Sequence, residues 1–184
     1  MSSMNIRGIA ILAVAVVILG SVVGVLMYGE KAGQQQEEAQ PQEPGQAEAR
    51  QVAERIASYL QAFARLPPNP DYSPELMRLY MLLNSEEPVA ILFWPSNCGS
   101  CIQYKEQVWD QVKNLFDNVT FVDYRLDTPE GAAIASAFEI PGITIVLSYN
   151  GTVLGAVYGE HLPAQQLAEV LKLLTMHASR GVGT

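Results

Sequence analysis

The hydrophobic and polar positions of the chain divide it into segments of different character. Residues 8–29, between Arg7 and Glu30, carry no charge and are mostly Ile, Leu, Val or Ala. About 20 such residues cross a bilayer as a helix, so we expect a transmembrane helix here. A cleaved signal peptide is the alternative. Its apolar core usually spans no more than about 15 residues and precedes a small-residue cleavage site, which is missing here. The pattern therefore favours an uncleaved anchor.

The next two segments are polar and then amphipathic. Residues 30–49 are rich in Gln, Glu, Ala and Pro and contain no large apolar side chain. They cannot bury enough surface to offset the entropy of ordering, so a disordered linker is expected. Residues 50–66 predict an amphipathic helix that ends before Pro67, because apolar side chains recur there at helical spacing. Its apolar face packs on the chain's own domain, docks another protein or lies against the membrane surface.

From Ser73 onward, helical and strand patterns alternate. Ser73-Pro74-Glu75 predicts a helix that runs to about Leu83, because it combines an N-cap, a first-turn proline and a first-turn acid. Val89 to Phe93 is a short, continuous apolar run, which is typical of a central strand buried on both faces. Helical periodicity over 102–116 and a strand over 119–126 complete a βαβ unit.

The last third of the chain continues the alternation. Thr128-Pro129-Glu130 predicts the start of a helix that runs to about Phe138. Residues 143–149 and 152–158 are expected to be strands, joined by Asn150-Gly151, a strong hairpin signal. Residues 163–177 place apolar side chains on one face and predict a final helix. The order of elements is that of an α/β fold.

The candidate chemistry lies in Cys98-Gly99-Ser100-Cys101, directly after the central strand. These are the only two cysteines of the chain. A disulfide that closes so small a loop barely constrains the unfolded chain, so the pair favours redox chemistry over a structural role. A structural zinc site needs about four ligands, and the only histidines are His161 and His177, so no metal site is expected within one molecule. A metal or cluster held between two copies is an alternative.

Charge and flanking residues bear on partners and location. The net charge of -8 disfavours nucleic acid as a partner, because an acidic surface repels phosphates. We favour the amino terminus inside the cell, so that the acidic bulk lies outside the cytoplasm. Sequons at Asn118 and Asn150 are compatible with glycosylation of an outside domain. Gly20 and Gly24 fit the G-x-x-x-G pattern and are compatible with a weak homodimer.

The stretch from Phe93-Trp94 to Cys98-Gly99-Ser100-Cys101 resembles the active site of the thioredoxin family, in which a C-x-x-C follows the central strand and opens a helix. Arg125-Leu126-Asp127 and the segment from Phe138 to Ile143 are similar to a second segment of that family. The resemblance implies a thioredoxin-like fold with a central mixed sheet flanked by helices. It also implies that Cys98 is the nucleophile, with its pKa lowered at the helix N-terminus, and that Cys101 is the resolving cysteine.

Three residues depart from the family pattern. Leu92 replaces a buried aspartate that serves as proton acceptor, and Asn97 replaces a tryptophan. The family's cis-proline falls on Thr144, for which a trans bond is expected because a cis bond before a non-proline residue costs about 2.5 to 4 kcal/mol. Pro141 is the alternative occupant of that role. Residues expected to support the site or line the substrate groove are Trp94, Asn97, Gly99, Ser100, Ile143 and Thr144.

Other polar residues near the strand ends receive ordinary structural interpretations. Arg125 is either a helper of the thiolate or a solvated salt bridge, and Trp94 either lines the site or packs in the core. Asp123 and Asp127 are interpreted as turn or cap residues, and His161 as a residue near a helix start. We expect none of them to be catalytic.

The sequence as a whole predicts a membrane-anchored thiol-disulfide oxidoreductase without cofactor or metal. Its expected partners are protein thiols and disulfides near the membrane, a membrane or extracytoplasmic redox partner, and the lipid bilayer through residues 8–29. The alternative is a non-catalytic docking subunit of a membrane complex. The expected segments are a tail (1–7), a transmembrane helix (8–29), a linker (30–49), an amphipathic helix (50–66), a thioredoxin-like domain (73–178) and a flexible tail (179–184).

Overall fold

The computed structural model describes residues 44–159 and 162–181. The predicted tail, transmembrane helix and glycine pair, together with residues 30–43 and His161, lie outside the described residues. Within the described ranges, no helix has the length and apolarity that a membrane crossing requires. The elements are α2 (Pro44–Ala64), α3 (Pro74–Leu83), β1 (Val89–Trp94), α4 (Gly99–Tyr104), the π-helical turn η3 (Lys105–Trp109), α5 (Asp110–Lys113), β2 (Thr120–Arg125), α6 (Pro129–Phe138), β3 (Thr144–Tyr149), β4 (Thr152–Tyr158) and α7 (Ala164–Gly181).

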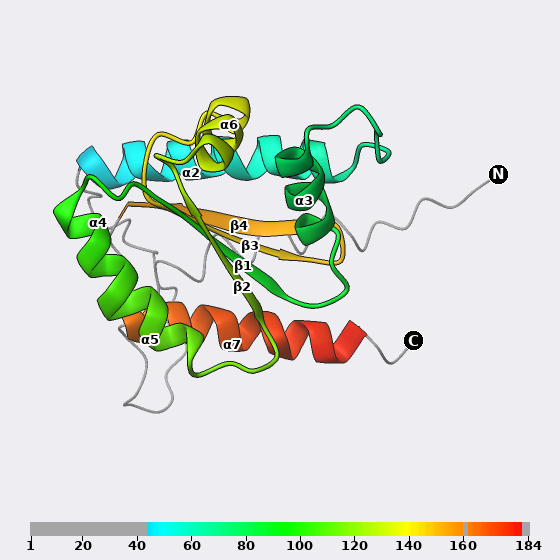
Figure 1. Cartoon of the computed structure of the whole chain (residues 1–184). Helices are drawn as coiled ribbons and strands as arrows, with labels where there is room; N and C mark the ends of the chain where they lie inside the picture. Colours follow the sequence, from blue (N-terminus) through cyan, green and yellow to red (C-terminus); the bar gives the residue numbers. More distant parts are fainter. Residues whose placement is uncertain (1–43, 160–161, 182–184) are drawn as a thin grey trace, which may run out of the picture. The chain divides into compact units, whose positions relative to one another are not determined.

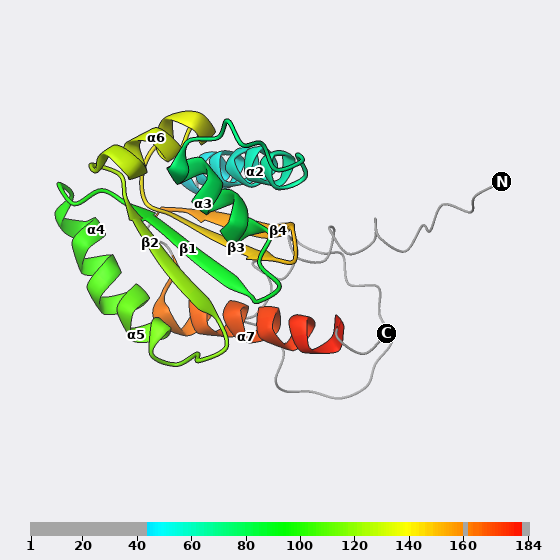
Figure 2. The same cartoon turned by 45° about the vertical axis from the view of Figure 1, so that its right-hand side comes forward.

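The four strands form one mixed sheet in the order β2-β1-β3-β4. β1 pairs in parallel with β2 and antiparallel with β3, and β3 pairs antiparallel with β4. Helices cover both faces: α2, α3 and α6 lie on one side, and α4, α5 and α7 on the other (Figures 1 and 2). The predicted α/β fold, a central mixed sheet flanked by helices, is therefore confirmed for the described residues.

Alternation along β1 divides the core into two clusters. Val89, Ile91 and Phe93 belong to the cluster beneath α2, α3 and α6, whereas Ala90 and Leu92 belong to the cluster shared with α4, α5 and α7. All five of these side chains are 0% exposed. Successive strand residues point to opposite faces, so a strand covered on both sides must be apolar throughout. Leu92 therefore faces the same cluster as Cys101.

Helix α2 begins earlier than the sequence predicts and belongs to the domain. It starts at Pro44, so 44–49, assigned to the linker, are helical. Gln, Ala, Glu and Arg are good helix formers, and here their propensity extends a helix that tertiary packing already stabilises. Ile56 and Leu60 are 0% exposed within the first cluster. The Gln61 side chain bonds Gly151 O and Val153 N of the β3–β4 hairpin, at 3.1 and 2.8 Å.

The apolar face of α2 packs against the chain's own sheet. It is therefore not free to dock another protein or the membrane. Residues 44–181 fall within one compact unit, and the domain therefore starts at α2 and not at residue 73. At the other end, α7 continues to Gly181, so residues 179–181 of the predicted tail are helical. Ala178, near the end of that helix, is buried.

Local signals at the other element ends act as predicted. Ser73 Oγ accepts from Leu76 N, and Thr128 Oγ1 accepts from Gly131 N, each as the N-cap of a helix with proline in its first turn. Asn150 and Gly151 have positive φ angles of 48° and 73°. Asn and Gly tolerate this left-handed conformation, which a tight hairpin between β3 and β4 needs.

The helix after the cysteines contains a π-helical turn that the sequence pattern does not reveal. In η3, the Asp110 N–H bonds Lys105 O, which is five residues back. The turn places Trp109 in the same buried cluster as Cys101 and Tyr104. In an uninterrupted α-helix, Trp109 would point about 80° away from Cys101, because each residue advances about 100°. The wider π-turn therefore brings Trp109 onto the same face of the helix as Cys101 and Tyr104.

Two buried tyrosines differ in whether their hydroxyl groups are satisfied. Tyr124 Oη has no hydrogen-bond partner among the described residues, and burial raises its pKa to about 12. Its ring stacks on Phe93, with 5.4 Å between the ring centroids. Tyr104 Oη instead donates to Leu162 O at 2.8 Å.

We expect Tyr124→Phe to stabilise the protein by about 1 kcal/mol, because it removes an unsatisfied buried hydroxyl and keeps the ring. Tyr104→Phe, the same chemical change at a satisfied hydroxyl, should destabilise it by about the same amount. Urea unfolding at neutral pH measures both. Equal destabilisation by the two variants would contradict this assignment.

Candidate active site

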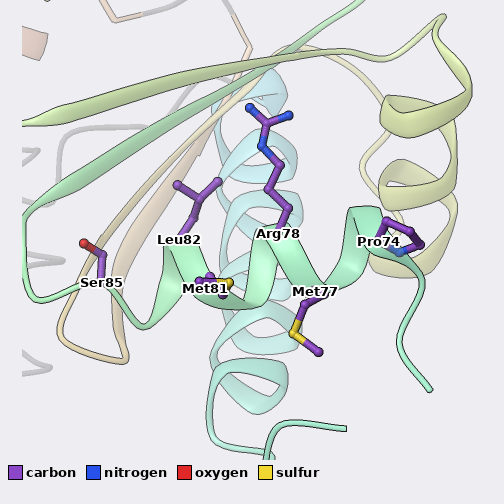
Figure 3. A pocket seen from close by; sticks show the side chains of 6 residues that line it. All are labelled: Pro74, Met77, Arg78, Met81, Leu82 and Ser85. Atoms are coloured by element: carbon purple, nitrogen blue, oxygen red, sulfur yellow. The ribbon is translucent and has the colours of Figure 1, made fainter. Parts of the chain in front are cut away.

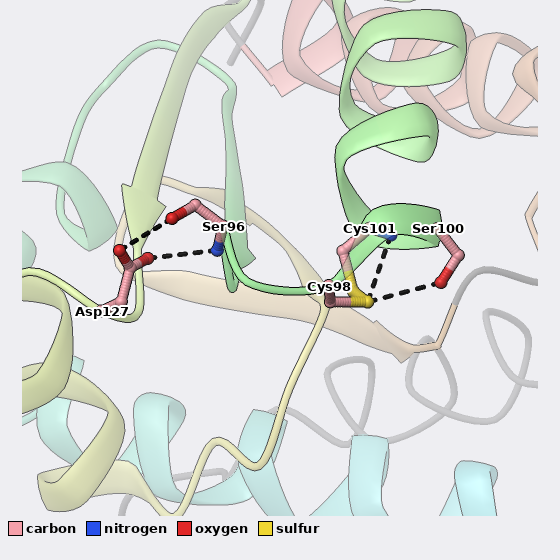
Figure 4. The surroundings of a disulfide bond; sticks show 5 residues. All are labelled: Ser96, Cys98, Ser100, Cys101 and Asp127. Atoms are coloured by element: carbon pink, nitrogen blue, oxygen red, sulfur yellow. Dashed lines mark hydrogen bonds between the residues drawn. A yellow bond between two sulfur atoms is a disulfide. The ribbon is translucent and has the colours of Figure 1, made fainter.

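Cys98 and Cys101 form a disulfide at the junction of β1 and the following helix (Figure 4). Their Cα atoms lie 5.2 Å apart. Cys98 is the N-cap of α4 and is half-buried, whereas Cys101 is 5% exposed and packs in the second cluster. One sulfur is therefore within reach of a partner and the other is shielded by the core.

Two groups of the first helical turn approach the Cys98 sulfur. The Cys101 N–H donates to Cys98 Sγ at 3.3 Å, and Ser100 Oγ lies 3.3 Å from the same atom (Figure 4). A disulfide sulfur has no hydrogen to donate, so the Ser100 hydroxyl is the donor in this state. Donors aimed at a sulfur, together with the positive end of a helix, stabilise a thiolate when the disulfide opens. Gly99 and Ser100 are exposed beside the pair, as is Asn97.

No carboxylate occupies position 92 beneath the cysteines. Leu92 is fully buried in the second cluster and pairs with Ile145 of β3. Asp123, its register partner on β2, is exposed. Position 92 therefore carries an apolar side chain, and Cys101 lies among apolar neighbours.

Trp94 packs against the core cluster and lies near an ion pair. Its ring packs against the cluster that contains Cys101, and its Nε1 is buried without a hydrogen-bond partner among the described residues. Lys105 Nζ lies 5.9 Å from the ring centroid and 2.9 Å from Asp110 Oδ2. The hydrogen bond to Asp110 holds the pKa of Lys105 above its ordinary value. The π-turn brings these two side chains, five residues apart, to one side of the helix.

Of the residues expected at or beside a cis-proline position, Ile143 and Thr144 are buried and Pro141 is exposed. Thr144 begins β3 opposite Phe93, is 0% exposed, and donates from Oγ1 to Gly142 O at 3.1 Å. Ile143 is buried in the cluster that contains Cys101, whereas Pro141 is exposed. No peptide bond among the described residues is cis, so the expected trans bond at Thr144 is found, and Pro141 has no cis bond either.

Asp127 hydrogen-bonds the loop in front of Cys98, a contact that the sequence did not reveal. Its carboxylate accepts from Ser96 N at 3.1 Å and from Ser96 Oγ at 2.8 Å (Figure 4). Arg125 Nε lies 3.3 Å from the same carboxylate, so the salt-bridge interpretation of Arg125 holds. Thr128, not Asp127, caps α6. No local pattern marks this contact, because Ser96 and Asp127 are 31 positions apart.

Other features of the described surface do not extend the site. No group of three or more His, Cys, Asp or Glu side chains that could hold a metal occurs in the described ranges. A shallow groove runs along the outer face of α3 and contains none of the predicted site residues (Figure 3). Its lining residues are Pro74, Met77, Arg78, Met81, Leu82 and Ser85.

Comparison with known proteins finds likeness only among solved structures. No protein-family model and no curated protein matches the chain. Mitochondrial thioredoxin 3 from Saccharomyces cerevisiae, in its oxidised form, is 23% identical, with 53% of this chain and 88% of that chain covered and a TM-score of 0.45. Thioredoxin from Trypanosoma brucei brucei is 22% identical over 55% and 88% of the two chains, with a TM-score of 0.45. Thioredoxin O2 from Arabidopsis thaliana is 17% identical over 51% and 80%, with a TM-score of 0.44.

The hydroxyl beside Cys98 gives a test of how the thiolate is stabilised. In the reduced protein, Ser100→Ala should slow alkylation of Cys98 by iodoacetamide at pH 6 about 3- to 10-fold, because a net hydrogen bond of about 1 kcal/mol to the thiolate is lost. Ser100→Thr keeps the hydroxyl and serves as the control. Equal rates for Ser100→Ala and the unchanged protein would show that the hydroxyl does not assist the thiolate.

Proposed function

We propose that this chain is a thiol-disulfide oxidoreductase that exchanges disulfides with cysteines of other proteins. The observation that carries the proposal is the disulfide between a half-buried Cys98 at a helix N-terminus and a buried Cys101 one turn on. A thiolate at such a position is stabilised and reactive, and a second thiol within bonding distance can resolve the intermediate. The alternative, a non-catalytic docking subunit, loses the free α2 face that would serve for docking, because Ile56 and Leu60 are buried in the domain.

The exchange proceeds in two balanced steps. The Cys98 thiolate attacks one sulfur of the partner's disulfide; that bond breaks, the departing sulfur takes a proton, and a mixed disulfide forms. Cys101 then attacks Cys98 Sγ, its proton passing to the second departing sulfur of the partner. Two electrons have moved to the partner, and Cys98 and Cys101 are joined. The reverse sequence oxidises a partner dithiol.

The apolar surroundings of Cys101 bear on the second step. Leu92 stands in place of a carboxylate, and no carboxylate is buried among the described residues to take the Cys101 proton, so the departing partner sulfur accepts it. Burial in apolar surroundings disfavours a thiolate. The burial of Cys101 therefore shields it from direct reaction with solutes, while the adjacent Cys98 sulfur stays within its reach.

The cellular setting of the proposal rests on the amino-terminal sequence. We propose that residues 8–29 anchor the chain in a membrane as a single span and that the domain faces the extracytoplasmic side, where its partners are protein thiols and disulfides near the bilayer. If residues 30–43 form a flexible tether of about 14 residues, its end-to-end distance is about 20 Å. Such confinement raises the effective concentration of the dithiol toward membrane partners.

The catalytic proposal predicts distinct results for the two cysteines. Cys98→Ser should abolish reduction of insulin disulfides, because it removes the nucleophile. Cys101→Ser should accumulate a mixed disulfide with a partner protein, since nothing resolves it. Non-reducing gel electrophoresis detects that adduct. Retained activity in Cys98→Ser, or no adduct with Cys101→Ser, would sink the proposal.

The membrane proposal predicts how the expressed chain fractionates. The full chain should stay with membranes after carbonate washing, and a chain lacking residues 1–43 should be released, because the apolar segment is gone. In intact cells, a membrane-impermeant maleimide should label the reduced Cys98 of the full chain. Labelling only after lysis would place the domain on the opposite side.

A further inference from the structure

The loop that carries Cys98 is tied to the loop that follows β2. The carboxyl ends of β1 and β2 lie next to each other, because the two strands are parallel neighbours. Leu126 N donates to Trp94 O at 2.9 Å, extending the pairing by one bond. Beyond it, both oxygens of Asp127 accept from Ser96, one from the backbone N–H and one from the hydroxyl. Three hydrogen bonds therefore fix the chain from Trp94 to Ser96.

Asp127 accepts these hydrogen bonds best when its carboxyl group is ionised. Its hydrogen bonds with the Ser96 hydroxyl and backbone N–H lower its pKa below the ordinary value. Arg125 adds an opposite charge at 3.3 Å. The carboxylate does not cap α6, since Thr128 does so. Its interactions are thus directed to the loop before the cysteines.

We propose that Asp127 is a positioning residue for the dithiol. By fixing Ser96, it holds Cys98 two residues later at the helix N-terminus, within bonding distance of Cys101. This inference rests on the proposed function, because the quantity that it controls is the ease with which the Cys98–Cys101 disulfide forms. Asp127 acts through Ser96, because its two hydrogen bonds come from Ser96 and its ion pair is with Arg125.

The physical basis is the effective concentration of one thiol at the other. In the disulfide, the covalent bond itself limits the distance between the sulfurs. In the dithiol, only the backbone does so. A loop that is already ordered loses little entropy when the bond closes, whereas a loose loop loses more. The Ser96–Asp127 contact therefore favours the disulfide over the dithiol.

The equilibrium with glutathione measures this quantity. Protein dithiol and glutathione disulfide give protein disulfide and two glutathione thiols: the Cys98–Cys101 bond forms, the bond of glutathione disulfide breaks, and two electrons and two protons pass to glutathione. The equilibrium constant of this reaction reports the effective concentration of the two cysteines. It requires no protein substrate, so it can be measured even if the chain reduces no protein disulfide.

The experiment compares four variants of the full chain, purified in a mild detergent. Asp127→Ala should lower the equilibrium constant about 5- to 10-fold, because two hydrogen bonds that order the loop are lost. Asp127→Asn should stay within about twofold of the unchanged chain, since an amide oxygen accepts from the Ser96 N–H and its NH2 donates to the Ser96 hydroxyl oxygen. Ser96→Ala, which keeps one bond, should lower the constant about 2- to 3-fold.

Glu130→Ala is the matched control. It also removes one carboxylate paired with an arginine, Arg78, but from α6. Its constant should be unchanged. Unchanged constants for Asp127→Ala and Ser96→Ala would overturn the proposal, as would equal losses in Asp127→Asn and Asp127→Ala, which would assign the effect to charge. If Asp127→Ala does not fold, Ser96→Ala and Asp127→Asn decide alone.

The test of Asp127 can succeed or fail independently of the test of the proposed function. A shift of the glutathione equilibrium in Asp127→Ala, with no insulin reduction by the unchanged chain, would support the positioning role and reject the protein-disulfide activity. Insulin reduction with an unshifted equilibrium would do the reverse. A lower melting temperature without a shift in the equilibrium would assign Asp127 to stability alone.

Discussion

The structure depends on β1 being enclosed on all four sides. Strands β2 and β3 pair with its two edges, and helices cover its two faces. A strand in this position has no water to satisfy its polar groups, so its backbone must be fully paired and its side chains apolar. The enclosure ends where β1 ends, at Trp94. There the chain leaves the sheet and presents the cysteines, with Cys98 half-buried and Cys101 buried in the core.

The enclosure of β1 also shapes the chemistry of the pair. Because Leu92 faces the cluster that holds Cys101, the region beneath the disulfide is apolar. Charge lies instead at the periphery, in the Lys105–Asp110 pair beside Trp94 and in the Arg125–Asp127 pair beside Ser96. Ion pairs that are partly or largely exposed to solvent, as these are, contribute little to stability in general. The Asp127 carboxylate also bonds Ser96, so this pair bears on the geometry of the loop before Cys98.

How much of the structure could be predicted from the sequence depended on how far apart in the chain the residues that determine each feature lie. The Ser73 and Thr128 caps and the Asn150-Gly151 turn were predictable, because each is decided by neighbours within about four residues. The central strand and the cysteine pair were predictable for the same reason. The long-range features were not. Which surface covers α2 depends on a sheet formed by later residues, and the Ser96–Asp127 contact joins positions 31 apart.

The π-turn was hidden for another reason. Residues 102–116 fit a helical period closely enough that no break is visible, and the extra residue in the turn is revealed only by where Trp109 must pack. The start of α2 was missed because 44–49 contain no apolar face to detect, although their composition suits a helix. Polar helix formers and disordered linkers share much of their composition, and packing further along the helix decides between them.

The Cys98 sulfur has two roles that are usually given to different atoms. It is the N-cap of α4, accepting from Cys101 N, and it is also the atom whose bonds change during exchange. The order of the first helical turn and the redox state are therefore thermodynamically linked, and linkage is reciprocal. A partner that unwinds or tightens this turn on binding would shift the reduction potential of the pair without contacting a sulfur. Conversely, each change of redox state would alter how firmly the helix begins.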